Sequence, residues 1–459
     1  MAHDGTQHDE DLGTARRLDQ DRRKREMPDL PTGPDALRDL LPHAADLRVN
    51  LALQPTLVDD GAPRTPDAEG FWRLQGWLDT VHACALDGFP FEVDTVLWRA
   101  AMGDRALPER SLEASLVDVH AWYTAERGGS VAPIPNTSGP GGLRTALGPA
   151  GLEALASRAC GPGTRLRHTR GYQGPIQRSK VLRRPPAGRT YLRAQLAALA
   201  TWAAPDEPYD PGGPREPADA HGGAPDETPA HAAALAPHAP PPDPLLRAAV
   251  VYGRMRLLHP FRQANGRMAV LAVDRALRRV PGGAAARIGL AHELRAREAA
   301  CVQALRAVGR TGSWDAWVRT FFELVRSAVD ATWARWCAYV RAYRAVLARL
   351  EGPDGRDLLG RRRIGAPRLA QLLARQPYVG IQHLVAAGVA QRRTAGRYLR
   401  ALQRLGVIVP TAYGLPTVFR VSAVADALGV KAQPAGRRPG LDRIAAVGRT
   451  VIPVDLNDP

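Results

Sequence analysis

Lysine is scarce in this chain of 459 residues, which carries 62 lysines and arginines, all but Lys24, Lys180 and Lys431 of them arginine. Acidic side chains number 46, so the formal net charge is +16. Such an excess is typical of proteins that bind nucleic acids. The chain is also rich in alanine, glycine and proline, and a general bias towards these residues and arginine accounts for part of the charge. The charge therefore suggests a nucleic-acid partner without establishing one.

Long apolar runs are absent: no stretch approaches the ~18 apolar residues that a membrane span needs, so we expect no membrane partner. The first 25 residues are polar and mixed in charge, which argues against a secretory signal. The cysteines are few, lie far apart and form no Cys-x-x-Cys pair, which excludes zinc-ribbon and thioredoxin-type sites. We expect plain thiols in a reducing cytoplasm at Cys84, Cys160, Cys301 and Cys337.

Helical periodicity dominates the middle of the chain. Apolar side chains recur at helical spacing in segments for which we predict helices: 71–86, 93–102, 112–126, 151–158, 190–203, 245–258, 268–279, 290–308 and 314–350. An extended, glycine-broken stretch over 165–179 interrupts them. The pattern predicts a mainly α fold.

Shifts in composition predict the boundaries of the domains. We expect a disordered tail, an N-terminal helical region, a helical core and a flexible tail, at 1–30, 31–140, 141–350 and 432–459. Within the core, residues 205–244 are mostly Pro, Ala, Gly, Asp and His, which cannot bury a core, so we predict a disordered insertion. Its histidines are irregularly spaced and no cysteine joins them, which disfavours a metal site at His221, His231 and His238.

Residues 366–421 are predicted to form a separate small unit. Three helices, with a glycine turn between the second and third, are followed by a β-hairpin over 406–421, which is typical of a winged helix-turn-helix. The third helix carries arginines that can contact DNA phosphates or guanine edges: Arg392, Arg393, Arg397 and Arg400. Because the predicted wing has few basic residues, a solvated helix face or a protein partner stays open as the alternative.

The segment HPFRQANGR at 259–267 is the most informative in the chain. It is predicted to be a tight loop that opens a helix, with small residues at Ala264 and Gly266 that let a ligand approach the backbone. The N-terminus of a helix presents unpaired N–H groups and a partial positive charge, which together bind anions. We therefore expect a phosphate-binding cradle at the start of this helix.

Three side chains of the same segment suit phosphate chemistry. Arg267 can hold a phosphate with two parallel hydrogen bonds, and Asn265 can donate to a phosphate oxygen. His259 can act as a general base, since an unperturbed imidazole has a pKa of about 6.5. The pattern predicts a phosphate cradle beside a general base, whereas a histidine in isolation would be interpreted as a capping residue.

This segment resembles the signature loop of the Fic family (filamentation induced by cyclic AMP), which runs His-x-Phe-x-(Asp/Glu)-Gly-Asn-Gly-Arg-x-x-Arg. The matching residues are His259, Phe261, Asn265, Gly266 and Arg267. Nearby, LLRAAVVYGRMRLLHPF resembles the helix before the loop, TGSWDAWVRTFFELV the Gly-x-Trp-x-x-Trp helix after it, and RLRHTRGYQGPIQ the flap hairpin. The resemblance extends over roughly 37–421 and is strongest over 245–325.

The resemblance implies a Fic-type helical core with a small β-hairpin flap, and transfer of a nucleoside monophosphate, usually AMP from ATP, to a protein hydroxyl. In that scheme His259 deprotonates a Ser, Thr or Tyr of the target protein. The phosphates of ATP, accompanied by Mg²⁺ or Mn²⁺, are held by Ala264, Asn265, Gly266 and Arg267. The flap aligns the target by adding a strand, through Gly174, Pro175, Ile176 and Gln177.

Three positions depart from the signature. Gln263 stands where the family has an acidic metal ligand, and its uncharged amide predicts weaker Mg²⁺ binding. Ala264 replaces a glycine, a mild change that narrows the approach to the phosphates. Val270 replaces the last arginine, so the usual contact with the terminal phosphate is missing.

Many Fic proteins also carry an inhibitory helix with the motif (Ser/Thr)-x-x-x-Glu-(Gly/Asn), whose glutamate pairs with that last arginine. The best match here is ACALDG at 83–88, with alanine for Ser/Thr and Asp87 for Glu. Aspartate is one methylene shorter and the arginine is replaced by Val270, so we expect inhibition by this route to be weak or lost. The alternative is that Asp87-Gly88 only ends a helix.

Two functions are consistent with these observations. The first is a cytoplasmic Fic-type nucleotidyltransferase, a protein adenylyltransferase impaired by Gln263 and Val270. The second is a catalytically degraded Fic-fold protein that senses a nucleotide and regulates by binding DNA through 366–421. The sequence does not name the target protein, and it leaves open whether a second copy of the chain is a partner in a homodimer.

Overall fold

The computed structural model describes residues 27–31, 37–53, 66, 68–88, 91–102, 142–160, 165–167, 189–204, 243–262, 264–277, 288–359, 365–411 and 418–431. The chain divides into two compact units. We call Met1–Val58, Gln75–Phe91 and Leu112–Trp333 the core unit, and Asp59–Leu74, Glu92–Ser111 and Ala334–Pro459 the C-terminal unit. The predicted helix over 112–126, the flap residues 174–177, Gln263 and both predicted tails except 27–30 lie outside the described residues.

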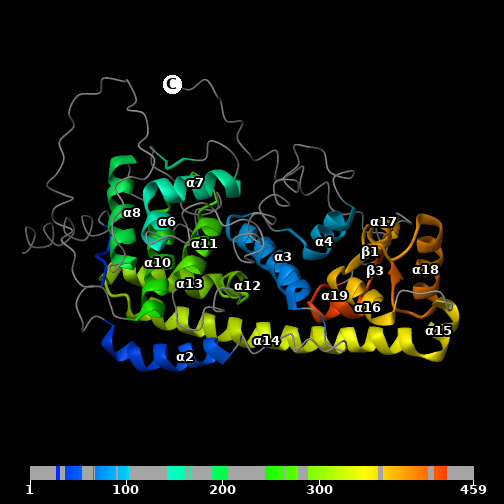
Figure 1. Ribbon diagram of the computed structural model, residues 1–459. Coiled ribbons are helices and arrows are strands. Elements are labelled where there is room, and N and C mark those ends of the chain that lie inside the picture. Colours follow the sequence, from blue (N-terminus) through cyan, green and yellow to red (C-terminus); the bar gives the residue numbers. More distant parts are fainter. Residues whose placement is uncertain are drawn as a thin grey trace, which may run out of the picture. The chain divides into compact units, whose positions relative to one another are not determined.

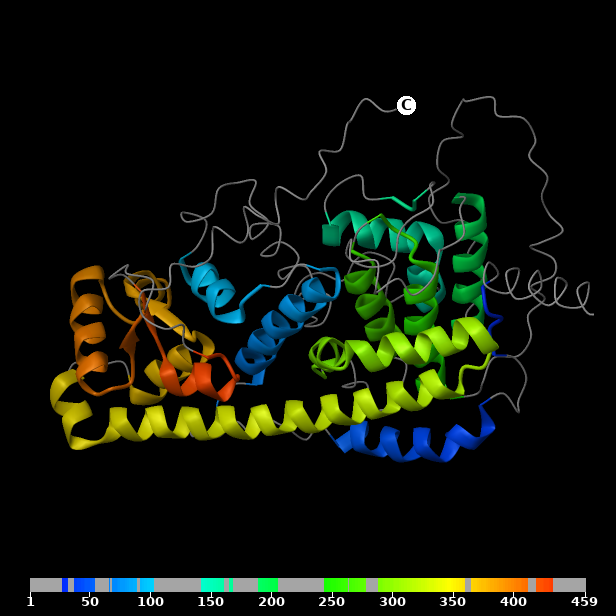
Figure 2. The ribbon, with the colours of Figure 1, turned by 180° about the vertical axis from the view of Figure 1, so that it is seen from behind.

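The described part of the core unit is built from helices, as the periodicity predicts (Figure 1). They are η1 Arg38–Leu40, α2 Leu41–Leu53, α6 Gly142–Leu147, α7 Pro149–Cys160, α8 Arg189–Ala203, α10 Pro244–Leu258, α11 Asn265–Leu277, α12 Leu290–Ala296 and α13 Glu298–Thr311. Two longer helices, α3 Ala68–Leu86 and α14 Asp315–Glu351, contribute residues to both units. From front and back, α10 and α11 lie side by side with α6 and α8 next to them (Figures 1 and 2).

Helix α10 is the central helix of the core unit. Asp243 caps its N-terminus, because a side-chain oxygen accepts from Leu245 N at 2.7 Å, and Pro244 fits the first turn. Helix α10 therefore begins at Pro244, the last residue of the predicted insertion over 205–244, with Asp243 as its N-cap. A Cβ on Gly253 would lie 2.8 Å from the rings of both Trp314 and Trp317, so only glycine lets α10 pack there.

The predicted single helix over 290–308 is wrong in one respect: it breaks at Arg297 into α12 and α13. Arg297 leaves helical geometry, with φ −110° and ψ 28°, although its N–H still donates to Glu293 O at 2.9 Å. No glycine or proline lies at the break, and the helical spacing of apolar residues continues across it. The sequence therefore contains no signal that would end the first helix at this point.

The C-terminal unit combines short helices with a small sheet. Its elements are α4 Val93–Met102, α15 Pro353–Leu359, α16 Ala366–Arg375, β1 Tyr378–Gly380, α17 Ile381–Ala386, α18 Arg392–Arg404, β2 Val409–Pro410, β3 Val418–Arg420 and α19 Ser422–Ala427. The strand order is β1-β3-β2, with both pairs antiparallel. The predicted hairpin corresponds to β2 and β3, whose register pairs Val409 with Arg420. Strand β1 and helix α19 were not predicted, because three to six residues are too few to show a period.

The mainly α fold is confirmed, with one three-stranded antiparallel sheet among the described residues. Cys84, Cys301 and Cys337 are free thiols, the first two buried, as expected. Among the helices that the structure describes, none has both the length and the apolar character needed to cross a membrane.

Candidate functional site

His259 closes helix α10 in the left-handed backbone region, with φ 49° and ψ 58°. Its N–H donates to Met255 O at 3.0 Å, which ends the helix, and the chain then turns into a loop before α11. Phe261 is fully buried and pairs with Leu166 in an isolated antiparallel bridge. The histidine therefore stands on a tight corner that is held from inside the core unit.

The side-chain amide of Asn265 holds this corner together with hydrogen bonds. Its Oδ1 accepts from Phe261 N at 2.9 Å and its Nδ2 donates to Phe261 O at 2.7 Å, which fixes the orientation of the amide. The same Nδ2 lies 3.2 Å from His259 Nδ1. Asn265 is 2% exposed. The predicted phosphate donor thus uses its amide to hold the loop and the histidine.

The environment of His259 keeps the imidazole neutral. Burial lowers its pKa from 6.5 to about 3, and the positive charges of Arg256 and Arg167 act in the same direction. Because Asn265 Nδ2 can only donate, the contact at Nδ1 places the ring proton on Nε2. Accepting a further proton therefore requires that the Asn265 contact opens or that the ring changes tautomer.

Ala264 lies directly before α11 with φ 63°, also in the left-handed region. Its carbonyl accepts from Met268 N at 2.9 Å, the first bond of the helix. A β-carbon in this region costs about 1–2 kcal/mol relative to glycine. The departure from the signature at this position is therefore more than mild, because it carries backbone strain.

The N-terminus of α11 already holds an anion, the carboxylate of Asp87. Its Oδ1 accepts from Gly266 N at 2.5 Å, and its Oδ2 accepts from Arg267 N at 3.2 Å and from Arg267 Nε at 2.8 Å. Both side chains are mostly shielded, at 5% exposed for Asp87 and 14% for Arg267. Two backbone amides and a guanidinium converge here as a phosphate cradle would require.

Gly266 makes this approach possible. A Cβ at this position would lie 2.7 Å from Leu86 Cβ and 2.8 Å from Asp87 Oδ1. Any larger residue would push the end of α3 away from the start of α11. The glycine of the signature therefore serves the contact with Asp87 as well as the proximity of a ligand.

Asp87 has an arginine partner at a position other than the one that the family motif gives. Val270 is fully buried, as an apolar core residue should be, and Asp87 pairs instead with Arg267, the first arginine of the signature. The family motif points only to the last arginine as a partner, so this pair does not follow from it. Asp87-Gly88 also lies at the end of α3, with Gly88 at φ 88°.

A metal site does not emerge from the described residues. Within those ranges no three His, Cys, Asp or Glu side chains lie close enough to hold an ion. Gln263, the predicted ligand, lies outside them, and the Asp87 carboxylate is engaged by three donors.

The predicted DNA-contacting arginines lie on α18, away from any signature residue in sequence. All four side chains, Arg392, Arg393, Arg397 and Arg400, are exposed. Three of them recur at i, i+4 and i+7 and so share one face, whereas Ala395, Leu399 and Leu402 are buried on the other. Gly388, at φ 61°, makes the turn between α17 and α18.

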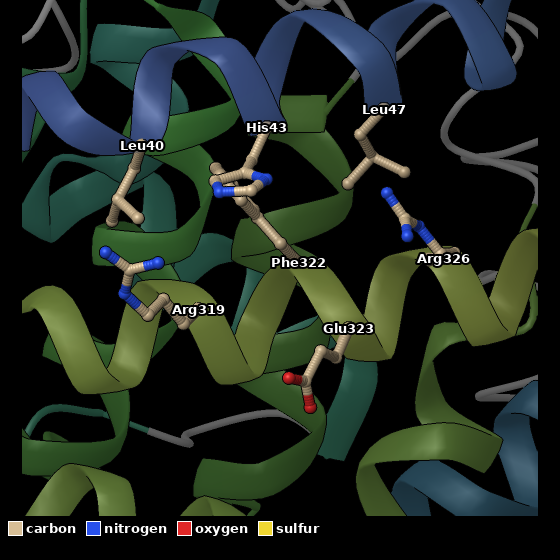
Figure 3. Close-up of a pocket in the computed structure, with 7 residues that line it drawn as sticks. All are labelled: Leu40, His43, Leu47, Arg319, Phe322, Glu323 and Arg326. Carbon is tan, nitrogen blue, oxygen red and sulfur yellow. The ribbon is translucent and has the colours of Figure 1, made fainter.

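A separate pocket of about 240 Å³ lies between α2 and α14 (Figure 3). Apolar and charged or polar side chains line it together: Leu40, His43, Leu47, Arg319, Phe322, Glu323 and Arg326. None of these residues belongs to the signature loop, so this pocket is distinct from the cradle.

These observations define a mainly helical protein with an anion cradle at a helix N-terminus beside a neutral histidine. Residues 362–423 match the family model for the C-terminal domain of SoFic-like protein adenylyltransferases. Together with the signature loop, this match supports a Fic domain protein. Among solved structures, a Fic family protein from Desulfovibrio desulfuricans G20 is similar, with 15% identity and a TM-score of 0.44 over 86% of this chain and 98% of that chain.

Proposed function

We propose that the chain is a Fic-type protein adenylyltransferase, which moves AMP from ATP to a Ser, Thr or Tyr hydroxyl of a target protein. The observation that carries the proposal is the convergence of Gly266 N, Arg267 N and Arg267 Nε on one anion. The matched description of the C-terminal domain, an adenylyltransferase type, supports the same activity.

The proposed reaction forms a bond between the hydroxyl oxygen and the α-phosphorus of ATP. The bond from that phosphorus to the bridging oxygen of the β-phosphate breaks, and pyrophosphate leaves. The hydroxyl proton goes to the neutral imidazole of His259, at Nδ1 once the Asn265 contact opens or at Nε2 after a change of tautomer. The amides of Gly266 and Arg267 and the Arg267 guanidinium stabilise the negative charge on the phosphates.

In this proposal the carboxylate of Asp87 inhibits transfer, because it is already bound at the start of α11. It uses the same three donors that a phosphate would use, so ATP must displace it before binding productively. The wild-type protein is therefore expected to be slow.

The test is transfer of label from ATP, GTP, CTP or UTP, with Mg²⁺ or Mn²⁺, to the protein itself or to lysate proteins. The wild type is compared with His259→Ala and with Arg319→Ala, which changes the separate pocket of Figure 3. We expect His259→Ala to abolish labelling and Arg319→Ala to leave it unchanged. If no nucleotide labels any protein, even in an Asp87→Ala background, the proposal is wrong.

A second function is favoured by the exposed arginines of α18. We propose that 366–421 is a winged helix-turn-helix whose α18 binds DNA, which suits a nucleotide-sensing regulator if transfer is lost. The double variant Arg393→Ala, Arg397→Ala should then abolish binding to DNA fragments, and the affinity of the wild type should fall steeply as salt rises. Binding that is absent, or insensitive to salt, excludes this function.

A further inference from the structure

Arg167 donates to the carbonyls of the corner that carries His259. Its Nε lies 2.7 Å from His259 O and its Nη2 lies 3.1 Å from Leu258 O. Its backbone N–H donates to Pro260 O at 2.9 Å. One residue thus binds three successive carbonyls, and it is 1% exposed.

These carbonyls need a partner from outside the helix. The last carbonyls of a helix have no intrahelical donor, and those at 258 and 259 are at the end of α10. His259 is also a non-glycine residue in the left-handed region and precedes a proline, two features that disfavour its conformation. Such a conformation persists where the surrounding structure stabilises it, and here the hydrogen bonds from Arg167 stabilise it.

The strand segment that bears Arg167 is itself anchored. Leu166 pairs with Phe261 across the bridge, and Leu166 N donates to Glu153 Oε1 at 3.0 Å. Glu153 in turn forms ion pairs with Arg189 at 3.3 Å and Arg193 at 3.5 Å. A series of contacts therefore connects α8 and α7, through the segment 165–167, to the corner that carries His259.

Arginine suits this task better than lysine. Its planar guanidinium carries several N–H donors in a fixed fork, so it can reach two neighbouring carbonyls at once. Its positive charge near the imidazole disfavours the imidazolium, in the same direction as burial lowers the pKa of His259. Geometry and charge therefore both favour a fixed, neutral histidine.

We propose that Arg167 is a positioning residue for His259: it holds the corner at 258–260 so that the imidazole faces the transferred phosphoryl group. This role rests on the proposed adenylyltransferase function. The anion at the start of α11 is held by other groups, the amides of Gly266 and Arg267 and the Arg267 guanidinium, so Arg167 should govern turnover and not nucleotide affinity.

The experiment uses the full chain with Arg167→Lys, Glu153→Gln and a matched control, Arg165→Lys, an exposed arginine two residues away. We expect Arg167→Lys to lower kcat about 10–100-fold, the loss that a misplacement of around 1 Å produces. The Kd for ATP should stay within about twofold, and Glu153→Gln should act in the same direction but less. Arg165→Lys should match the wild type in each measurement.

A readout independent of activity separates the two proposals. Carbethoxylation of His259 by diethyl pyrocarbonate, followed by mass spectrometry, reports how open the imidazole is. We expect it to be several-fold faster in Arg167→Lys than in the wild type or in Arg165→Lys. If neither the wild type nor Asp87→Ala transfers any nucleotide but His259 becomes more reactive in Arg167→Lys, the function is wrong and the positioning role stands. The role is overturned if a folded Arg167→Lys variant keeps the wild-type kcat and the wild-type rate of His259 carbethoxylation. An equal loss of kcat and of ATP affinity in this variant would overturn it as well.

Discussion

At the scale of single residues, the state of His259 decides whether the corner can do acid–base chemistry. Burial and two nearby arginines lower its pKa to about 3, so the ring is neutral throughout the physiological range. A neutral ring is ready to accept a proton, but a pKa of about 3 makes it a weak base, whereas the most effective general base has a pKa near the working pH. The burial that protects the protonation state therefore also limits the rate.

The first prediction concerns pH. The transfer rate should show no acidic limb between pH 5 and 8, since His259 is already neutral there. Stability follows the same group: below pH 6.5 the unfolded chain binds a proton that the folded chain does not, so this contribution is lost as pH falls from 6.5 towards 3. Single-turnover rates and urea midpoints measured across pH check both statements. An acidic limb near pH 6.5 in the wild-type rate, or a urea midpoint that falls no more below pH 6.5 in the wild type than in His259→Ala, would contradict them.

Ala264→Gly is the second prediction. Relief of the left-handed strain at φ 63° should stabilise the fold by about 1–2 kcal/mol, less about 0.4–1 kcal/mol for the greater freedom of glycine in the unfolded chain. A small net gain in the free energy of unfolding is therefore expected, measured by urea denaturation. Ala269→Gly, inside α11, is the matched control and should lose about 1 kcal/mol. A loss at both positions would show that Ala264 is not strained.

At the scale of elements, the two helices that frame the site were predictable from their own residues. Apolar periodicity marks α10 and α11, and the proline and glycine positions mark the loop between them. The break at Arg297, the strand β1 and the partner of Asp87 were not predictable. The partner of Asp87 depends on a contact between distant segments, which no local pattern encodes. Strand β1 is too short to show a period, and no glycine or proline marks the break at Arg297.

Asp243 gives the third prediction. Asp243→Ala removes the cap of α10, whose acceptor lies 2.7 Å from Leu245 N, and should destabilise the protein by about 1–2 kcal/mol. Asp243→Asn keeps an oxygen for the cap and loses the ion pair with half-exposed Arg48, so it should cost less than about 1 kcal/mol. Urea denaturation of both variants separates the cap from the charge. Equal losses would show that the ion pair, and not the cap, matters.

At the scale of the whole molecule, segments that are distant in sequence belong to the same compact unit. Residues 92–102 lie before the core in sequence but belong to the C-terminal unit, where α4 contacts β1 and β3. A buried polar link secures them: the Tyr378 hydroxyl donates to the Asp94 carboxylate, with Arg420 at 3.9 Å. This link joins residues 284 positions apart, so no local pattern in the sequence indicates it.

Tyr378→Phe is the fourth prediction. It removes a donor from a carboxylate that is 5% exposed and should destabilise the C-terminal unit by about 1–3 kcal/mol. Tyr398→Phe, on the partly exposed side of α18, is the control and should change the stability little. Urea denaturation, with the unfolding of each unit followed by hydrogen exchange of its own peptides, should show the loss in the C-terminal unit. An unchanged midpoint would mean that the Tyr378 hydroxyl contributes little to the stability of the C-terminal unit.

The central claim is that the start of α11 is a phosphate cradle whose donors Asp87 now occupies. Calorimetric titration of ATP into wild type, Asp87→Asn and Asp87→Ala tests it most directly. Removing the competing charge should tighten binding about tenfold or more in Asp87→Ala, a gain of at least about 1.4 kcal/mol, with Asp87→Asn between the two. Equal or weaker binding of ATP by a folded Asp87→Ala would contradict this claim.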